Sequence, residues 1–427
     1  MPVGYASPVA RIGVVESGFY SHIGAIKRVG RALERQGHCM VPLAPNDATD
    51  LPFSEQAHNH SPALERTSQR APIAAGLAEI AERYSEELIE ALVVSQLDLV
   101  IHDVMAPWGR VAADFCGVPR IVSNPLFLRR VPRRWGVLPR RHMKSGHPIT
   151  VLGERARGTA DDADAPEQVS DYERRVEAAR LAIARRWKVE LGHSQDVLFS
   201  PGDTIVSLNT ERIIGGRMRG GTWHFVGPLL DPPQLRHPAR DRPLVYVCYG
   251  SSFNNDAEPY RAAIDGLADE NVEVLVSLGG GSLTATDLGP LPSNAEVHDF
   301  AWSEEALARS SAYLTHGGSN SVHESLLAGV PMLLLPQGAD QFAVSRRIAR
   351  LGAGRIVEPS PAAIRAGVRW LLDNGRPRER AQQLGKHLAD FDGETRLAKV
   401  VERKLAAHTA ASPGAAEIGT AGYCPGQ

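Results

Sequence analysis

The stretch Ala312–Gln341 reads AYLTHGGSNSVHESLLAGVPMLLLPQGADQ and predicts one strand–helix–strand unit. Its first residues, 312–315, form an apolar strand that ends just before a glycine pair. The run 322–328 has helical spacing, follows small polar residues that favour a helix start, and stops at Gly329. Residues 332–335 are all apolar, as in a strand buried on both faces of a parallel sheet. The stretch therefore predicts an α/β fold.

The turn between the first strand and the helix has the chemistry of a site for a nucleotide sugar. The backbone N–H groups of residues 318–321 would point out of the helix start, where the helix dipole favours an anion such as a phosphate. His316 can donate a further hydrogen bond to a phosphate oxygen. Glu324, about one turn into the helix, can accept from two ribose hydroxyls. Asp340 and Gln341 can bind sugar hydroxyls as acceptor and as acceptor plus donor.

This stretch resembles the donor-binding signature of the family 1 glycosyltransferases, which transfer a sugar from a UDP- or dTDP-sugar to small molecules. The signature reads H-x-G-x-N-S-x-x-E, then G-x-P, P and D-Q. The matching residues are His316, Gly318, Asn320, Ser321, Glu324, Gly329, Pro331, Pro336, Asp340 and Gln341. An ordinary strand–helix–strand unit with a glycine turn is the alternative, but it requires neither the Asn-Ser-x-x-Glu run nor the Asp-Gln pair. Ser319, inside the matched run, joins the candidate donor-binding residues.

Length and composition are those of a two-domain globular protein. The chain has 427 residues, 43% of them hydrophobic and 22% charged, and its formal net charge of −2 argues against nucleic-acid binding. We expect no signal peptide, because residues 1–10 lack a basic stretch followed by an apolar one, and no transmembrane segment.

The cysteines are too widely spaced to predict a metal site or a redox pair. Three of the four lie in apolar surroundings and are predicted to be buried free thiols, which fits a cytoplasmic protein. The four are Cys39, Cys116, Cys248 and Cys424.

The start of the chain predicts a strand at 11–15 and a helix at 23–36, joined by a loop that lacks the G-x-G-x-x-G of a dinucleotide site. His22 ends that loop, on the ligand-binding edge of an open parallel sheet. With a pKa near ~6.5, an imidazole there can take a proton from an acceptor hydroxyl, so we predict that His22 is the catalytic base. A helix-capping histidine is the alternative. The resemblance implies the catalytic role too, because the family carries a histidine at this turn, commonly in G-H-x-x-P; here Ser21 and Ala25 replace the flanking Gly and Pro.

Asp103 is the predicted partner of His22. It follows a buried strand at 97–102, so it reaches the same edge of the same sheet. An aspartate bonded to one ring nitrogen fixes the imidazole tautomer and stabilises the imidazolium that forms on proton uptake. The resemblance implies the same pairing. The alternative is that Asp103 caps the next helix, predicted at 107–116.

The second half predicts another sheet and the rest of the donor site. Its first strand runs into Gly250 and Ser251, where a backbone amide or hydroxyl can meet the diphosphate, and the family has Gly-Ser here too. In the family's base-binding turn an aromatic is followed by x-P and then Gln or His. Here Phe300 takes the aromatic place, Trp302 replaces the proline and Ser303 the polar residue. Either ring can stack on uracil or thymine; for Trp302 a core aromatic is the alternative.

Other segments carry weaker predictions. Residues 46–76 are expected to form a long loop that can line an acceptor pocket, with His58 and His60 as solvated residues instead of metal ligands. An arginine cluster can bind an acidic acceptor, a membrane surface or a partner, with a solvated face as the alternative. It comprises Arg129, Arg130, Arg133, Arg134, Arg140 and Arg141. Helices are expected at 78–94 and 172–191.

The resemblance implies a GT-B fold, two doubly wound, Rossmann-like α/β domains facing across a cleft, over about residues 11–405. The expected divisions are an acceptor-binding domain at 1–230, a linker at 231–243, a nucleotide-sugar-binding domain at 244–390, a helix returning to the first domain at 391–408 and a disordered tail at 409–427.

We therefore expect an inverting hexosyltransferase that moves a sugar from a UDP- or dTDP-sugar to a hydroxyl of a small, hydrophobic natural product, as in antibiotic biosynthesis. The nucleotide sugar is a co-substrate, and we expect no cofactor and no metal, because a helix start can do the work of a cation. The partners expected are the nucleotide sugar and the small acceptor, with a weak homodimer left open. Two other functions stay open, a nucleotide-sugar epimerase of the same architecture and a non-catalytic helper that binds a partner through the arginine cluster.

Overall fold

The computed structural model describes residues 9–43, 70–127, 166–191, 203–215, 223–233, 241–251, 255–338 and 340–411. The predictions for His58, His60, the arginine cluster and most of the tail lie outside these ranges. Within them, no helix combines the length and the apolar character needed to cross a bilayer.

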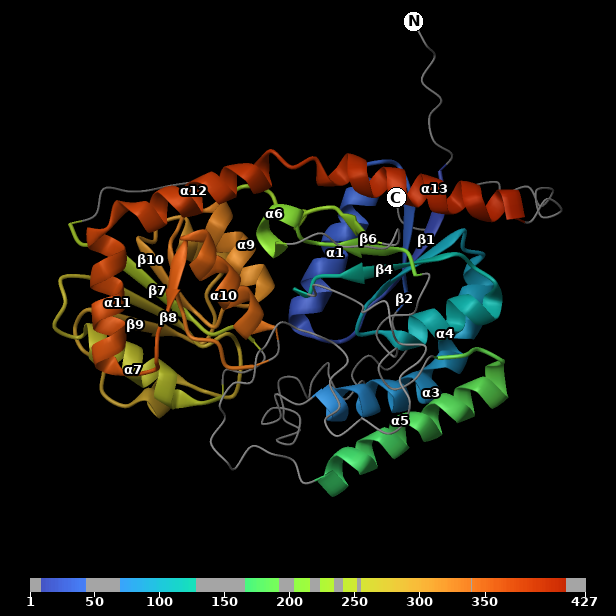
Figure 1. The fold of residues 1–427 in the computed structure, drawn as a ribbon, viewed down its shortest axis with the longest axis horizontal. Helices are drawn as coiled ribbons and strands as arrows, with labels where there is room; N and C mark the ends of the chain where they lie inside the picture. The colour runs from blue at the N-terminus through green and yellow to red at the C-terminus, as the bar shows by residue number, and fades with distance from the viewer. Residues whose placement is uncertain are drawn as a thin grey trace, which may run out of the picture.

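The described residues form two lobes, each built on a six-stranded sheet in which every pairing is parallel (Figure 1). The strand order in the first lobe is β2-β1-β3-β4-β5-β6. These strands are β1 (Arg11–Val15), β2 (Cys39–Leu43), β3 (Leu99–Asp103), β4 (Arg120–Asn124), β5 (Ile205–Ser207) and β6 (Trp223–Phe225).

The second lobe has the strand order β12-β11-β10-β7-β8-β9. Its strands are β7 (Leu244–Cys248), β8 (Glu273–Ser277), β9 (Ala295–His298), β10 (Ala312–Thr315), β11 (Met332–Leu334) and β12 (Gly354–Ile356). Both orders run outward from a central pair in two directions, which is doubly wound topology. The prediction of a GT-B-type α/β fold is confirmed.

Helices cover both faces of each sheet. Those of the first lobe are α1 (Tyr20–Glu34), α3 (Arg70–Ser95), α4 (Pro107–Cys116), α5 (Pro166–Trp187) and α6 (Glu211–Ile214). Those that follow are α7 (Ala257–Leu267), α8 (Ser303–Leu307), α9 (Ser319–Leu327), α10 (Gln341–Leu351), α11 (Pro361–Asp373), α12 (Gly375–Ala389) and α13 (Gly393–Ala411). In Figure 1, α12 lies along the second lobe and α13 continues over the first, where it contacts α1 and β6.

The cores explain why the strands are apolar without interruption. Alternate residues of β3 enter separate clusters, Val100 with α3 and α4, and Leu99 and Ile101 with α1 and α13. In β7, Tyr246 and Val247 likewise belong to different clusters. Each sheet is therefore buried on both faces. Polar groups are left to the loops beyond the ends of the strands.

Three predicted helices differ from those observed. Helix α1 begins at Tyr20, so His22 lies within its first turn instead of before it. Helix α3 begins at Arg70, inside the predicted loop, because Pro72 in a first turn loses no intrahelical bond. The returning helix predicted at 391–408 is α13, which begins at Gly393, where any Cβ would overlap the Val226 carbonyl oxygen.

The cysteine prediction is confirmed in full only for Cys248, which is a buried free thiol. Cys116 is free but only half-buried, and Cys39 is disulfide-bonded. Spacing along the chain could not reveal this pairing, because bonded cysteines meet through the fold and not through the sequence. The first residues of the predicted tail, 409–411, also differ, since they continue α13.

Candidate active site

The predicted site residues gather where each sheet reverses its strand order. In the first lobe this point lies between β1 and β3, and in the second between β7 and β10. His22 follows β1 and Asp103 ends β3. Gly250 follows β7 and His316 follows β10. Because ligands of open α/β sheets bind beyond the carboxyl ends of the strands at such a reversal, both halves of the predicted site lie where the topology places a ligand.

His22 and Asp103 are in direct contact. The Nδ1 atom of His22 lies 2.8 Å from Oδ1 of Asp103, which also accepts a hydrogen bond of 2.8 Å from the Met105 N–H. Both side chains are buried. A carboxylate can only accept, so Nδ1 carries the hydrogen and Nε2 is left as the basic nitrogen. Asp103 does not cap α4, whose N-cap is Ala106.

The surroundings of His22 favour its protonated form. Burial alone would lower the pKa of His22, but the charge and hydrogen bond of Asp103, with a contribution from the charge of Asp340, raise it above its ordinary value. Asp340 belongs to the second lobe, between β11 and α10. The predicted base and a predicted sugar-binding carboxylate therefore interact electrostatically across the two lobes.

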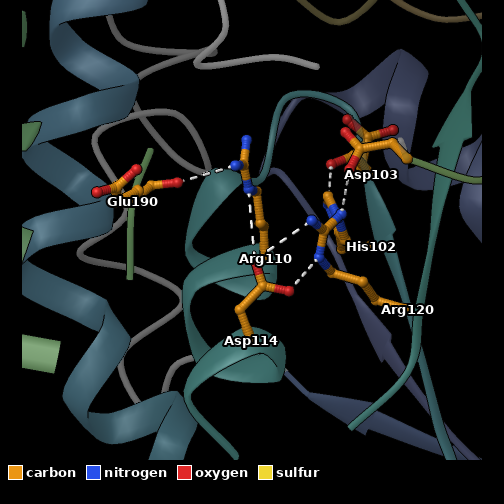
Figure 2. Close-up of polar contacts among 7 residues, drawn as sticks. His102, Asp103, Arg110, Asp114, Arg120 and Glu190 are labelled. Atoms are coloured by element: carbon orange, nitrogen blue, oxygen red, sulfur yellow. Dashed lines mark hydrogen bonds and ion pairs between the residues drawn. The ribbon is translucent and has the colours of Figure 1, made fainter. Parts of the chain in front are cut away.

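A polar network beside Asp103, part buried and part exposed, was missed by sequence analysis. Figure 2 shows Arg110 between Glu190 and Asp114, with Arg120 on the other side of Asp114 and His102 below Asp103. Arg120 donates to the Asp114 carboxylate at 2.6 Å and 3.2 Å, and to Oδ1 of Asp203 at 2.7 Å. The bond to Asp114 ties α4 to β4, and α4 follows directly from the loop after Asp103. The network thus fixes the elements on either side of Asp103.

His102 belongs to this network as a neutral donor. Its Nδ1 donates to the backbone oxygen of Asp103 at 3.0 Å. Burial, with the charge of Arg120, lowers the pKa of His102 to about 4. The available signal in the sequence was the His-Asp pair at the end of an apolar strand, from which only Asp103 was taken as a site residue and His102 was given no role.

The start of α9 has backbone donors and no side-chain cap. Its N-cap is Gly318, and the first backbone bond of the helix runs from the Val322 N–H to the Gly318 oxygen at 3.0 Å. The Ser319 Oγ is buried and, among the described residues, has no hydrogen-bond partner. A helix start with open amides and an unsatisfied hydroxyl is suited to an anion.

His316 packs against two glycines at this helix start. A Cβ on Gly250 would lie 2.6 Å from its ring, and a Cβ on Gly318 would overlap its Nε2. Gly250 and Gly317 also have φ of +83° and +79°, which favour glycine. Burial lowers the pKa of His316 to about 4, so at neutral pH the ring is uncharged and donates from one nitrogen.

Glu324 of α9 is joined by a hydrogen bond to Ser303, which directly follows the aromatic residues Phe300 and Trp302 in sequence. The Glu324 carboxylate accepts a hydrogen bond from Ser303 Oγ at 2.7 Å. Burial raises the pKa of Glu324, although the Ser303 bond and the charge of Arg28 act to lower it. The rings of Phe300 and Trp302 are 5.0 Å apart and perpendicular. They are 42% and 64% exposed, so the alternative of Trp302 as a core aromatic is wrong.

Other predicted donor-binding side chains are engaged within the protein. The Asp340 carboxylate accepts from the Phe127 N–H at 2.9 Å, and burial raises its pKa. The Gln341 side-chain oxygen accepts from the N–H groups of Gln337 and Gly338 at 2.8 Å and 3.0 Å. A role for Gln341 toward a sugar would therefore rest on its amide nitrogen.

Three more predicted residues complete the set. Asn320 uses both ends of its side-chain amide in contacts with α1. Ser321, in the first turn of α9, and Ser251, just after β7, are partly buried. The predicted residues thus lie beyond the carboxyl ends of strands in both lobes, although Phe300, Trp302 and Ser303 follow the edge strand β9 and not a reversal point. Their roles stay predictions.

The described residues contain no candidate metal centre. No group of three or more His, Cys, Asp or Glu side chains there could hold a metal ion. A cavity of about 690 Å³ lies elsewhere, between α6, β6 and the junction of α12 with α13, with Arg396, Lys399 and Arg403 on one wall.

In sequence, the chain is similar to known glycosyltransferases. Residues 261–402 match the family described as Erythromycin biosynthesis protein CIII-like, C-terminal domain. An uncharacterized UDP-glucosyltransferase, YojK, of Bacillus subtilis is 25% identical over 70% of this chain and 71% of its own length. Demethyllactenocin mycarosyltransferase of Streptomyces fradiae is 37% identical over 31% of this chain and 29% of its own.

Solved structures agree on the fold. The glycotransferase of kitacinnamycin superposes with a TM-score of 0.71 at 21% identity, covering 93% of this chain and 99% of its own. Spinosyn rhamnosyltransferase SpnG complexed with thymidine diphosphate has a TM-score of 0.61 at 18% identity, covering 92% and 100%.

Proposed function

The chain belongs to the family 1 glycosyltransferases of GT-B fold, related to the macrolide and antibiotic glycosyltransferases, and from this premise we propose that it transfers a sugar, with inversion, from a UDP- or dTDP-sugar to a hydroxyl of a hydrophobic natural product. His22 is the base, Asp103 orients it, and α9 binds the donor diphosphate.

The proton follows a short route in this proposal. The acceptor hydroxyl gives its proton to Nε2 of His22 as its oxygen forms a bond to the anomeric carbon. Asp103, 2.8 Å from Nδ1, stabilises the imidazolium that results. General-base help of this kind contributes about 10²- to 10⁴-fold to a rate. The product keeps the acceptor oxygen, and the proton leaves to solvent afterwards.

The leaving group is stabilised by the second lobe. The bond between the anomeric carbon and the diphosphate oxygen breaks, and negative charge grows on the nucleoside diphosphate. The open amides of α9 and one N–H of neutral His316 meet that charge, and one well-placed donor is worth about 3 kcal/mol in other enzymes. A single displacement by an oxygen on the face opposite the leaving group inverts the anomeric configuration.

Substrate classes follow from relatives and from the site. The relatives include a UDP-glucosyltransferase and a mycarosyltransferase, and thymidine diphosphate is bound in a solved relative. Phe300 and Trp302 are exposed and can stack on either pyrimidine. We propose a pyrimidine nucleotide donor and a polyketide-like or macrolide-like acceptor.

The observation that carries the proposal is the His22–Asp103 contact at one strand reversal, facing the charge of Asp340 from the other lobe. The test is to incubate the protein with UDP-glucose or dTDP-glucose and a panel of hydrophobic aglycones. Expected is an aglycone heavier by one hexose, with inverted anomeric configuration by NMR, and no product from His22→Ala. Wild-type protein that forms an epimer from donor alone, or retains the configuration, would contradict it.

A further inference from the structure

One buried arginine, on the same helix as His22, joins the two halves of the site. Arg28 lies on α1, six residues after His22, and is 7% exposed. Its Nε donates to the Pro228 oxygen at 2.9 Å, and its Nη2 donates to Oδ1 of Asn320 at 2.9 Å. The first bond anchors the guanidinium inside its own lobe, and the second reaches the first turn of α9.

Asn320 completes a closed set of contacts. Its Nδ2 donates to the backbone oxygen of Ser21 at 2.8 Å, while its Oδ1 is held by Arg28. Ser21 directly precedes His22. The two ends of one amide therefore attach the start of α9 to the turn of α1 that carries the proposed base. A shift of α9 relative to α1 would break both bonds.

The guanidinium of Arg28 is buried and, among the described residues, forms no ion pair. Among the described residues no carboxylate oxygen forms a salt bridge with it, and its two contacts are neutral oxygens. Burial lowers its pKa to about 10, with the charge of Glu324 acting in the opposite sense, so it stays a cation at neutral pH. Burial and this cation lower the pKa of neighbouring His323 to about 3, so that ring stays neutral.

Such a charge favours an anion at the start of α9. Taking a guanidinium out of water costs several kcal/mol unless nearby groups compensate it, and neutral oxygens compensate it only in part. A diphosphate on the α9 amides would lie next to Asn320 and add the missing negative charge. The same cation would then strengthen both diphosphate binding and the contact between the lobes.

We propose that Arg28 is a positioning residue for the sugar transfer: it holds the diphosphate-binding turn of α9 against the His22 turn of α1 and adds positive charge behind that turn. This inference rests on the proposed function. Arg28 touches neither donor nor acceptor, so its effect passes through Asn320 and through the field at the helix start.

The test compares Arg28→Met, Arg28→Lys and the control Arg31→Met. Arg31 lies one turn further along the same helix and is exposed. Each protein is titrated with UDP or dTDP and with the matching nucleoside, and kcat is measured at saturating donor. Melting temperatures establish which proteins are folded, and Arg28→Lys serves if Arg28→Met does not fold.

We expect Arg28→Met to weaken diphosphate binding about tenfold or more, since truncating one partner of a buried charged hydrogen bond costs that much elsewhere. Nucleoside binding should change less than about twofold, because a nucleoside brings no charge to the helix start. Arg28→Lys should recover most of the diphosphate affinity but not kcat, since an ammonium lacks the planar fork that makes both bonds. Arg31→Met should match wild type.

Unchanged diphosphate affinity and kcat in Arg28→Met would overturn the inference. So would equal losses for nucleoside and diphosphate, which indicate a general structural change, or full recovery of kcat by lysine. Wild-type protein that bound neither diphosphate would instead overturn the proposed function, and the inference with it.

Discussion

At the scale of single residues, the proposed function depends on the imidazole of His22 and on which of its two nitrogens is bonded to Asp103. Nδ1 of His22 faces Asp103, and Nε2 is left for a proton. The histidine and the aspartate were both predictable, because a polar residue at the end of an apolar parallel strand faces the ligand edge. A bond between Asp103 and one ring nitrogen was predicted, and the structure shows that the bonded atoms are Nδ1 of His22 and Oδ1 of Asp103.

The pH dependence of transfer follows from the raised pKa of His22. The base works only when neutral, so kcat/KM should rise with pH, with a midpoint above the ordinary histidine value of about 6.5. Asp103→Asn removes the charge that raises the pKa, so the midpoint should move to lower pH while kcat falls about 10²-fold or more.

The measurement is a pH–rate profile of both proteins with a titration of nucleoside diphosphate alongside. Diphosphate affinity should be the same in both, because Asp103 lies in the other lobe. A midpoint that stays in place in Asp103→Asn would remove the aspartate from its proposed role.

At the scale of elements, the strands and helices around the donor site followed closely from sequence. β10 has the predicted bounds, since an apolar run that ends just before a glycine pair leaves little freedom. The start of α1 was harder, because its N-cap Phe19 makes no side-chain capping bond and gives no sequence signal.

Two glycine-to-alanine variants, one at the start of α9 and one as a control, test the predicted diphosphate site. Gly318→Ala places a methyl group against the His316 ring, which must move away from the open amides, so diphosphate affinity should fall about tenfold. Gly30→Ala on α1 is the matched control, because a Cβ there meets nothing within 4 Å. It should bind diphosphate as wild type does and be slightly more stable. Equal affinities in the two variants, by calorimetry, would argue against a diphosphate site here.

At the scale of the whole molecule, the contacts between the lobes could not be predicted. Asn320 with Ser21, and Asp340 with Phe127, join residues hundreds of positions apart. Periodicity reports the faces of single elements and carries no information on which distant loops meet. The signature match identified Asn320 and Asp340 as site residues without indicating that their side chains also join the lobes.

Stability of the whole chain should fall in acid. His102 and His323 are 2% exposed and have pKa values of about 4 and about 3, well below the unfolded value. The unfolded state therefore binds protons first as pH falls below about 6.5, and each histidine withdraws on the order of 3 kcal/mol of stability by the time its folded pKa is reached.

Urea unfolding at pH 7, 5.5 and 4.5 would measure this loss. His102→Asn keeps a nitrogen donor but cannot gain a proton in this range, so its stability should depend less on pH than that of wild type. Equal pH dependence in the two proteins would show that His102 is not held neutral in the fold.

The most direct measurement of the central claim is a crystal structure with UDP or dTDP bound. The account predicts diphosphate oxygens within hydrogen-bond distance of the amides of residues 319–321 and of the His316 ring, with the terminal phosphate directed toward His22. A diphosphate bound elsewhere, or one at α9 directed away from His22, would contradict it.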